Sequence, residues 1–114
     1  GARVLIMGAT FKENVSDIRN SKVADVVKEL KAFSLNVHVT DPHADSDELK
    51  HEYGFELTPA LSNDYDAVLV TVPHDDYKKL DDLYFASITK ENALVADLKG
   101  MYRGKINSRK YWSL

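Results

Sequence analysis

The sequence of 114 residues contains no cysteine. This absence excludes disulfide bonds, a thiolate metal site and a cysteine nucleophile within the chain. The sequence also lacks an apolar run near the roughly 18 residues needed to cross a bilayer, and no basic-then-apolar leader opens it. We therefore expect a protein that does not enter the membrane and that works in the cytoplasm.

Basic residues are not in excess, because 15 Lys and Arg face 18 Asp and Glu for a net charge of −3. This balance argues against a nucleic-acid-binding protein, which would show a basic surplus. Hydrophobic residues make up 44% of the chain, which is typical of a folded domain and not of a disordered one. The length predicts one domain over residues 1–114.

Short apolar segments alternate with helical patterns along the chain. Strands are predicted at residues 3–7, 36–40, 55–57, 67–72 and 93–97. Helices are predicted at residues 23–33 and 45–53 and somewhere within 75–88, followed by an irregular tail from Gly100. This alternation predicts an α/β fold: a Rossmann-like open, mainly parallel sheet of about five to six strands with helices on both faces.

In a Rossmann half the strand order reverses beside the first strand, which places the reversal here between residues 3–7 and 67–72. Ligands of such sheets bind outside the carboxyl ends of the strands at this point. The segments to search for a binding site are therefore residues 8–21, residues 73–77 and the turn around Lys99.

The first of these segments lacks the G-x-G-x-x-G fingerprint that brings a dinucleotide pyrophosphate close to the backbone. Only Gly8 is present, and the loop is several residues too long. A dinucleotide site within this domain is therefore not expected.

The segments do carry cations at Lys12, Arg19 and Lys99. A lysine offers a compact charge to a phosphate, and an arginine offers a planar fork. Three cations at one edge of an acidic protein indicate an anionic ligand. The alternatives are that Lys12 and Arg19 are solvated loop charges and that Lys99 pairs with Asp97.

Other polar residues give weaker signals. Asp41 ends the second strand, where a Rossmann domain holds its ribose-binding acid, but Pro42 follows and favours a structural turn. Asp75 and Asp76 beside His74 have no nucleophile to serve. The four histidines show no metal-ligand spacing, so we expect packing or surface roles and no metal site: His38, His43, His51 and His74.

The segment GATFKENVSDIRNSKV (residues 8–23) resembles the signature that opens the C-terminal domain of the UDP-glucose/GDP-mannose dehydrogenase family. Its core follows the pattern F-K-x-N-x-x-D-x-R. The resemblance continues through residues 40–42, 71–74 and 97–100 to the terminal Tyr-Trp-Ser-Leu, and so spans essentially the whole chain. The D-x-K-G turn and this ending are most similar to the UDP-N-acetylhexosamine branch.

The resemblance implies that residues 1–114 are a single C-terminal, UDP-sugar-binding domain of a larger dehydrogenase. An N-terminal Rossmann domain would hold NAD and the catalytic cysteine and lysine, and a helical middle domain would form a homo-oligomer. Within this chain, Phe11, Lys12 and Lys99 would contact the UDP-sugar, and Arg19 would reach the NAD pyrophosphate. No catalytic residue is expected here.

The implied reaction oxidises the C6 alcohol of a UDP-N-acetylhexosamine, or of UDP-glucose, to a carboxylate for polysaccharide precursor synthesis. The isolated domain should be inactive, because it lacks the cysteine. The alternative is a non-catalytic, Rossmann-like nucleotide-binding or oligomerisation module. A glycine fingerprint at residues 8–13 would have favoured that alternative, and it is absent.

Overall fold

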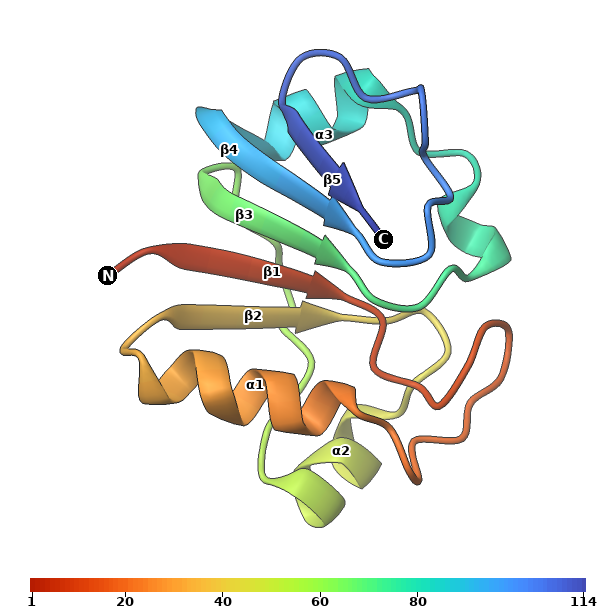
Figure 1. The fold of residues 1–114 in the computed structure, drawn as a ribbon. Helices are drawn as coiled ribbons and strands as arrows, with labels where there is room; N and C mark the ends of the chain where they lie inside the picture. The colour runs from red at the N-terminus through yellow and green to blue at the C-terminus, as the bar shows by residue number, and fades with distance from the viewer.

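A computed structural model describes all residues 1–114 and contains one five-stranded sheet in the order β2-β1-β3-β4-β5. Every neighbouring pair of strands is parallel, so the carboxyl ends lie at one edge, on the right in Figure 1. The strands are β1 (Arg3–Met7), β2 (Asn36–Thr40), β3 (Tyr65–Val70), β4 (Thr89–Asp97) and β5 (Lys110–Ser113). The α/β prediction with five to six strands is confirmed.

Helices cover both faces of the sheet, as predicted. The helical elements are α1 (Val23–Ala32), α2 (Ser46–Tyr53), the short 3-10 helix η1 (Asp75–Tyr77) and α3 (Asp82–Ile88). Val27 of α1 and Leu49 of α2 pack into one core with Ile6. Tyr77 of η1 and Phe85 of α3 pack into the core on the other face. The molecule therefore has three layers: the sheet forms the middle layer, with helices on each side of it.

The central position of β1 follows from its sequence. Residues 4–7 are apolar without alternation, and all four are buried, because side chains on both faces of a central parallel strand meet helices. β1 pairs with β2 on one side and β3 on the other. The predicted reversal of strand order beside β1 is confirmed.

The predicted strand at residues 55–57 is wrong. This segment lies beyond the outer edge of β2, where a Rossmann domain has its third strand, but it joins β2 only weakly. The Thr58 amide donates to the Val39 carbonyl at 2.8 Å, and Pro59 follows without an amide hydrogen. Phe55 is nevertheless buried against α2, so its apolar character serves the core.

The tail predicted to be irregular from Gly100 contains β5, which pairs with β4 from Lys110 to Ser113. The four residues of β5 alternate between exposed and half-buried positions, too short a pattern to identify a strand in the sequence. The region predicted to be helical within residues 75–88 divides into η1 and α3.

The ends of the helices depend on local chemistry. Asp45 caps α2 by accepting from the amides of Asp47 and Glu48, and Gly54 ends it at a φ of 82°. α1 begins after Lys22 without a side-chain cap on that residue. No helix has the length and apolar character that a membrane crossing requires.

Candidate functional site

The carboxyl ends of β1 and β3 meet closely at Gly8. Gly8 has a φ of +116°, and a Cβ built there would lie 2.7 Å from the Val72 backbone nitrogen. The Thr71 hydroxyl lies 2.7 Å from the Gly8 carbonyl oxygen. Only glycine fits this contact, which directs the following residues away from the sheet.

The loop after Gly8 carries Phe11 and Lys12 at its exposed tip. The Phe11 amide donates to the Asp17 carbonyl at 2.7 Å, and the Thr10 hydroxyl donates to the Lys12 carbonyl at 2.9 Å. The Phe11 side chain is 53% exposed, and the Lys12 ammonium has no hydrogen-bond or ion-pair partner. The backbone is therefore held while both side chains face solvent.

Arg19 lies in the turn before α1 and forms a two-pronged ion pair with Asp17. Its Nε and Nη2 donate to the Asp17 carboxylate at 3.0 and 3.1 Å. The Arg19 side chain still exposes 79% of its surface. These hydrogen bonds lower the pKa of Asp17 and raise the pKa of Arg19, so both stay charged at neutral pH.

Lys99 follows β4 and is exposed without a partner. The predicted alternative, an ion pair with Asp97, does not form. Asp97 is buried and accepts instead from the Tyr102 amide at 2.7 Å and from the Tyr111 hydroxyl at 2.6 Å. Asp97 thus fixes the turn that carries Lys99, a role that its sequence position alone did not reveal.

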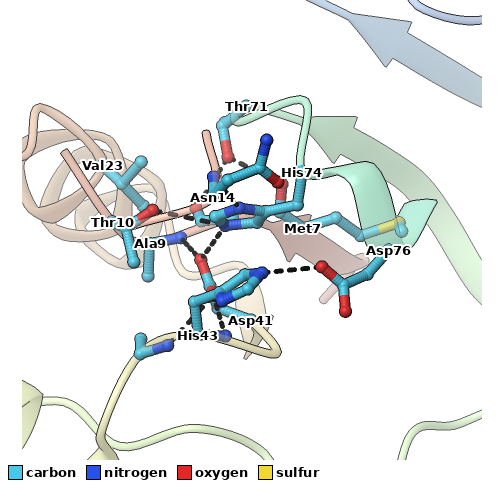
Figure 2. A network of polar contacts seen from close by, with 12 residues as sticks. Met7, Ala9, Thr10, Asn14, Val23, Asp41, His43, Thr71, His74 and Asp76 are labelled. Atoms are coloured by element: carbon cyan, nitrogen blue, oxygen red, sulfur yellow. Dashed lines mark hydrogen bonds and ion pairs between the residues drawn. The ribbon is translucent and has the colours of Figure 1, made fainter. Parts of the chain in front are cut away.

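A buried polar network joins the loops after β1, β2 and β3 (Figure 2). The side chains of Asp41 and His74 are both fully buried and form a pair, with His74 Nε2 2.9 Å from Asp41 Oδ2. Asp41 also accepts from the backbone amides of Ala9, His43 and Ala44. The structural turn expected of Asp41 is confirmed, whereas the network with His74 was missed, because no sequence spacing links these loops.

His43 and Asp76 extend this network to the surface. His43 Nε2 lies 2.6 Å from Asp76 Oδ1, and the ring of His43 lies 4.6 Å from that of His74. The hydrogen bond from His43 lowers the pKa of Asp76. The predicted packing and surface roles fit His43 and His74, and no group of three metal-ligating side chains comes together.

Phe11 and Lys12 are neighbours on one loop, whereas no hydrogen bond joins that loop tip to the side chain of Arg19 or of Lys99. Lys12 follows β1 and Lys99 follows β4, with β3 between the two strands. A hollow of about 270 Å³ beside the Asp41 network, lined in part by Met7 and Tyr77, includes none of the four predicted residues. Arg19 lines a different hollow together with Asp17 and Glu48.

A five-stranded parallel sheet whose strand order reverses beside β1, with helices on both faces, defines a Rossmann-like α/β domain. Residues 5–104 match the sequence profile of the UDP-glucose/GDP-mannose dehydrogenase family, UDP binding domain. The match covers most of the chain, and the chain belongs to this family.

Several nucleotide-sugar dehydrogenases are similar in sequence to this chain. The UDP-N-acetyl-D-glucosamine 6-dehydrogenase of Salmonella typhi is 41% identical over 100 residues, which cover 87% of this chain and 24% of that protein. Protein CapL of Staphylococcus aureus is also 41% identical, over 100% of this chain and 27% of its own length. The UDP-N-acetyl-D-mannosamine dehydrogenase of Methanococcus maripaludis strain C7 is 33% identical over 87% of this chain and 23% of its own.

A solved structure has the same fold. The UDP-N-acetyl-mannosamine dehydrogenase Cap5O of S. aureus superposes with a TM-score of 0.78 and 25% identity, over 99% of this chain and 26% of its own. The chain thus spans about a quarter of the length of the proteins it matches.

Proposed function

We propose that this chain is the C-terminal, UDP-sugar-binding domain of an NAD-dependent UDP-N-acetylhexosamine 6-dehydrogenase. The observation that carries the proposal is the presentation of Phe11 and Lys12. Both side chains are exposed and unpaired on a loop whose backbone is held at the reversal of strand order. Relatives that are 41% and 33% identical are named for UDP-N-acetylhexosamines, whereas a UDP-glucose 6-dehydrogenase is 26% identical, and this supports the former substrate.

In this proposal, the two lysines and Phe11 serve the UDP-sugar. Lys12 and Lys99 neutralise the diphosphate of the UDP-sugar from two sides, as compact charges without competing partners. Phe11 offers an exposed apolar ring to the bound sugar nucleotide. Positioning and charge neutralisation are therefore what this domain contributes to the reaction.

Arg19 serves the cofactor in this proposal. Asp17 holds the guanidinium through Nε and Nη2, which leaves Nη1 free and the group largely exposed. The exposed guanidinium can make a single contact to a pyrophosphate that another domain holds. The loop that begins at Gly8 lacks the glycines that would let it hold NAD itself. When bound, NAD accepts the hydride.

The other three quarters of such an enzyme would supply the NAD-binding domain with the catalytic cysteine and lysine. They would also supply the helical domain that forms a homo-oligomer. Oxidation of the sugar C6 alcohol to a carboxylate supplies acidic sugars for polysaccharide synthesis. The cytoplasmic location stays a prediction.

A titration of the isotope-labelled chain tests the proposal. UDP-N-acetylglucosamine should shift backbone amide signals around Lys12 and Lys99, and NAD should bind more weakly. Lys12→Ala should lower the affinity about 10-fold, the effect of losing a hydrogen bond to a charged phosphate. Lys28→Ala, on the exposed face of α1, is the matched control and should change nothing. Tighter binding of NAD than of the UDP-sugar would contradict the assignment.

A further inference from the structure

His74 is a buried titratable residue to which the proposed binding roles give no task. It follows β3, and its side chain is fully buried. Its ring contacts the loop after β1 at two points that flank residues 11–13. The Asn14 amide donates to Nδ1 at 2.9 Å, and the Thr10 hydroxyl lies 3.2 Å from Nε2. One imidazole therefore holds both ends of the tripeptide that carries Phe11 and Lys12 (Figure 2).

The network assigns the tautomer of this ring. A backbone amide can only donate, so Nδ1 of His74 must be the unprotonated acceptor for Asn14. Nε2 therefore carries the proton and faces Asp41 Oδ2 and the Thr10 oxygen. The Thr10 hydroxyl in turn donates to the Lys12 carbonyl. Hydrogen bonds thus run in one direction from His74 through Thr10 to the backbone of Lys12.

Further contacts fix both the ring and the far end of the loop. Asp41 Oδ2 accepts from the Ala9 amide at 2.6 Å as well as from His74, so it orients the ring against the start of the loop. Asn14 has a positive φ of 62°, and its side-chain oxygen accepts from the Asp75 amide at 2.8 Å. Without these contacts, the left-handed backbone at Asn14 would have little to stabilise it.

We propose that His74 is a positioning residue that clamps residues 10–14 and so presents Phe11 and Lys12 in a single conformation before a nucleotide arrives. This inference rests on the proposed role of Lys12 in binding the UDP-sugar. A loop ordered in advance loses less conformational entropy on binding, so the clamp raises affinity without touching the ligand. The buried carboxylate of Asp41 contributes indirectly, because it orients the His74 ring that clamps the loop.

Three substitutions separate the contacts of the clamp. His74→Phe keeps the ring volume and removes both hydrogen-bonding positions. His74→Asn keeps an acceptor near Nδ1 for Asn14, and His74→Gln keeps a donor near Nε2 for Asp41 and Thr10. Thermal unfolding monitored by circular dichroism identifies variants that stay folded. Thr10→Val against Thr10→Ser gives a second matched pair that leaves the ring in place.

The first readout needs no ligand. In folded His74→Phe, amide hydrogen exchange at Asn14 should accelerate about 10-fold or more, and NMR relaxation should show new motion at residues 10–14. The amides of β3 and β4 should stay protected. His74→Asn should restore part of the protection at Asn14. Unchanged exchange and relaxation in the loop would overturn the clamp.

The second readout is the affinity for UDP-N-acetylglucosamine in a mutant cycle. His74→Phe should weaken binding about 10-fold in the original chain but less than about 2-fold when Phe11→Ala and Lys12→Ala are both already present, because the clamp acts through these two side chains. Equal effects in both backgrounds would overturn the positioning role. Failure of the original chain to bind any UDP-sugar would instead overturn the proposed function, and the exchange measurement would still decide whether His74 clamps the loop.

Discussion

Lys12, Arg19 and Lys99 reach solvent from backbone segments that other residues hold in place. Asp97 fixes the turn before Lys99, and Asp17 accepts from both the side chain and the backbone amide of Arg19. Residues that fix the backbone, such as Asp17 and Asp97, therefore lie within two positions of the exposed cations Arg19 and Lys99. The exposed cations can therefore be replaced without disturbing the core. Gly8, which follows β1, is sensitive to replacement for a different reason, its close approach to Val72.

Gly8→Ala should destabilise the domain strongly. The added methyl would meet the Val72 backbone nitrogen at 2.7 Å, and the φ of +116° is unfavourable for any side chain. We expect a loss of about 2–4 kcal/mol in the free energy of unfolding, measured by urea denaturation. Gly104→Ala is the control, because Gly104 has a φ of +79° but no atom near its Cβ position. Its cost should be about 1 kcal/mol, and equal losses at both positions would show that close approach at Gly8 contributes nothing.

Lys12→Ala and Arg19→Ala should separate the two ligands in the full-length enzyme. We expect Lys12→Ala to raise the KM for the UDP-sugar about 10- to 100-fold, and Arg19→Ala to raise mainly the KM for NAD. Both side chains are exposed, so the melting temperature should be unchanged. Steady-state kinetics with each substrate varied in turn measures both constants. Equal effects on both substrates would contradict the assignment of Arg19 to the cofactor.

At the scale of elements, β5 joins the sheet through the residues that precede it. Arg109 donates to the Thr89 hydroxyl at 2.9 Å and to the Ala86 carbonyl at 3.1 Å, so it ties the start of β5 to the junction of α3 and β4. Asp82, in the first turn of α3, accepts from the amides of Asn107 and Ser108 and from the Ser108 hydroxyl. These polar contacts anchor the approach to β5, in addition to the pairing of β5 with β4.

Asp82 should make the attachment of β5 sensitive to acid. The hydrogen bonds from the Ser108 hydroxyl and the neighbouring amides lower the pKa of Asp82 below its ordinary value of 3.8. A depressed carboxyl pKa gives stability that is present above that ordinary value and is lost as pH falls through the lowered one. Asp82→Asn should therefore be less stable than the original chain at pH 7, and the difference should shrink below about pH 4.

Urea denaturation followed by the fluorescence of Trp112, the single tryptophan and a residue of β5, measures this difference at pH 7, 5 and 3. A stability difference that stays constant over this range would mean that the charge of Asp82 does not hold residues 107 and 108.

At the scale of the whole molecule, one face of the sheet is only half covered. α1 and α2 pack over β1 and β2, whereas Leu94 and Trp112 on the same face of β4 and β5 are 37% and 48% exposed. Of the predicted binding residues, Arg19 lines a hollow with Asp17 and Glu48, and that hollow does not include Lys12 or Lys99. In the proposed function, this domain binds the substrate and the other parts of the enzyme carry out its oxidation.

The isolated chain should therefore show no dehydrogenase activity. Incubation with NAD and several UDP-sugars should give no increase in NADH absorbance above a buffer control, because the chain has neither a cysteine nor a glycine-rich dinucleotide loop. Addition of UDP-N-acetylglucosamine in the same buffer should still shift the amide signals near Lys12. Sustained turnover by this chain would show that a catalytic centre lies within it.

The sequence by itself determined the elements whose patterns are local. The unbroken apolar run of β1 predicts burial on both faces, the spacing of Val23 and Val27 predicts a helix, and Gly54 marks the end of α2. The motif in residues 8–23 resembles the family signature, and this resemblance placed the chain in its family. The spacing of residues along a loop can be compared without knowledge of the fold. Those features use only residues close together in the chain.

Tertiary structure alone decided the features that depend on distant residues. β5 forms because β4 offers a free edge and Asp82 and Arg109 anchor its approach, whereas residues 55–57 carry a strand-like pattern but make too few bonds to β2. The pairing of Asp41 with His74 brings together residues 33 positions apart. Such contacts leave no periodic trace in the sequence, because their geometry is set by which strands the parallel sheet places side by side.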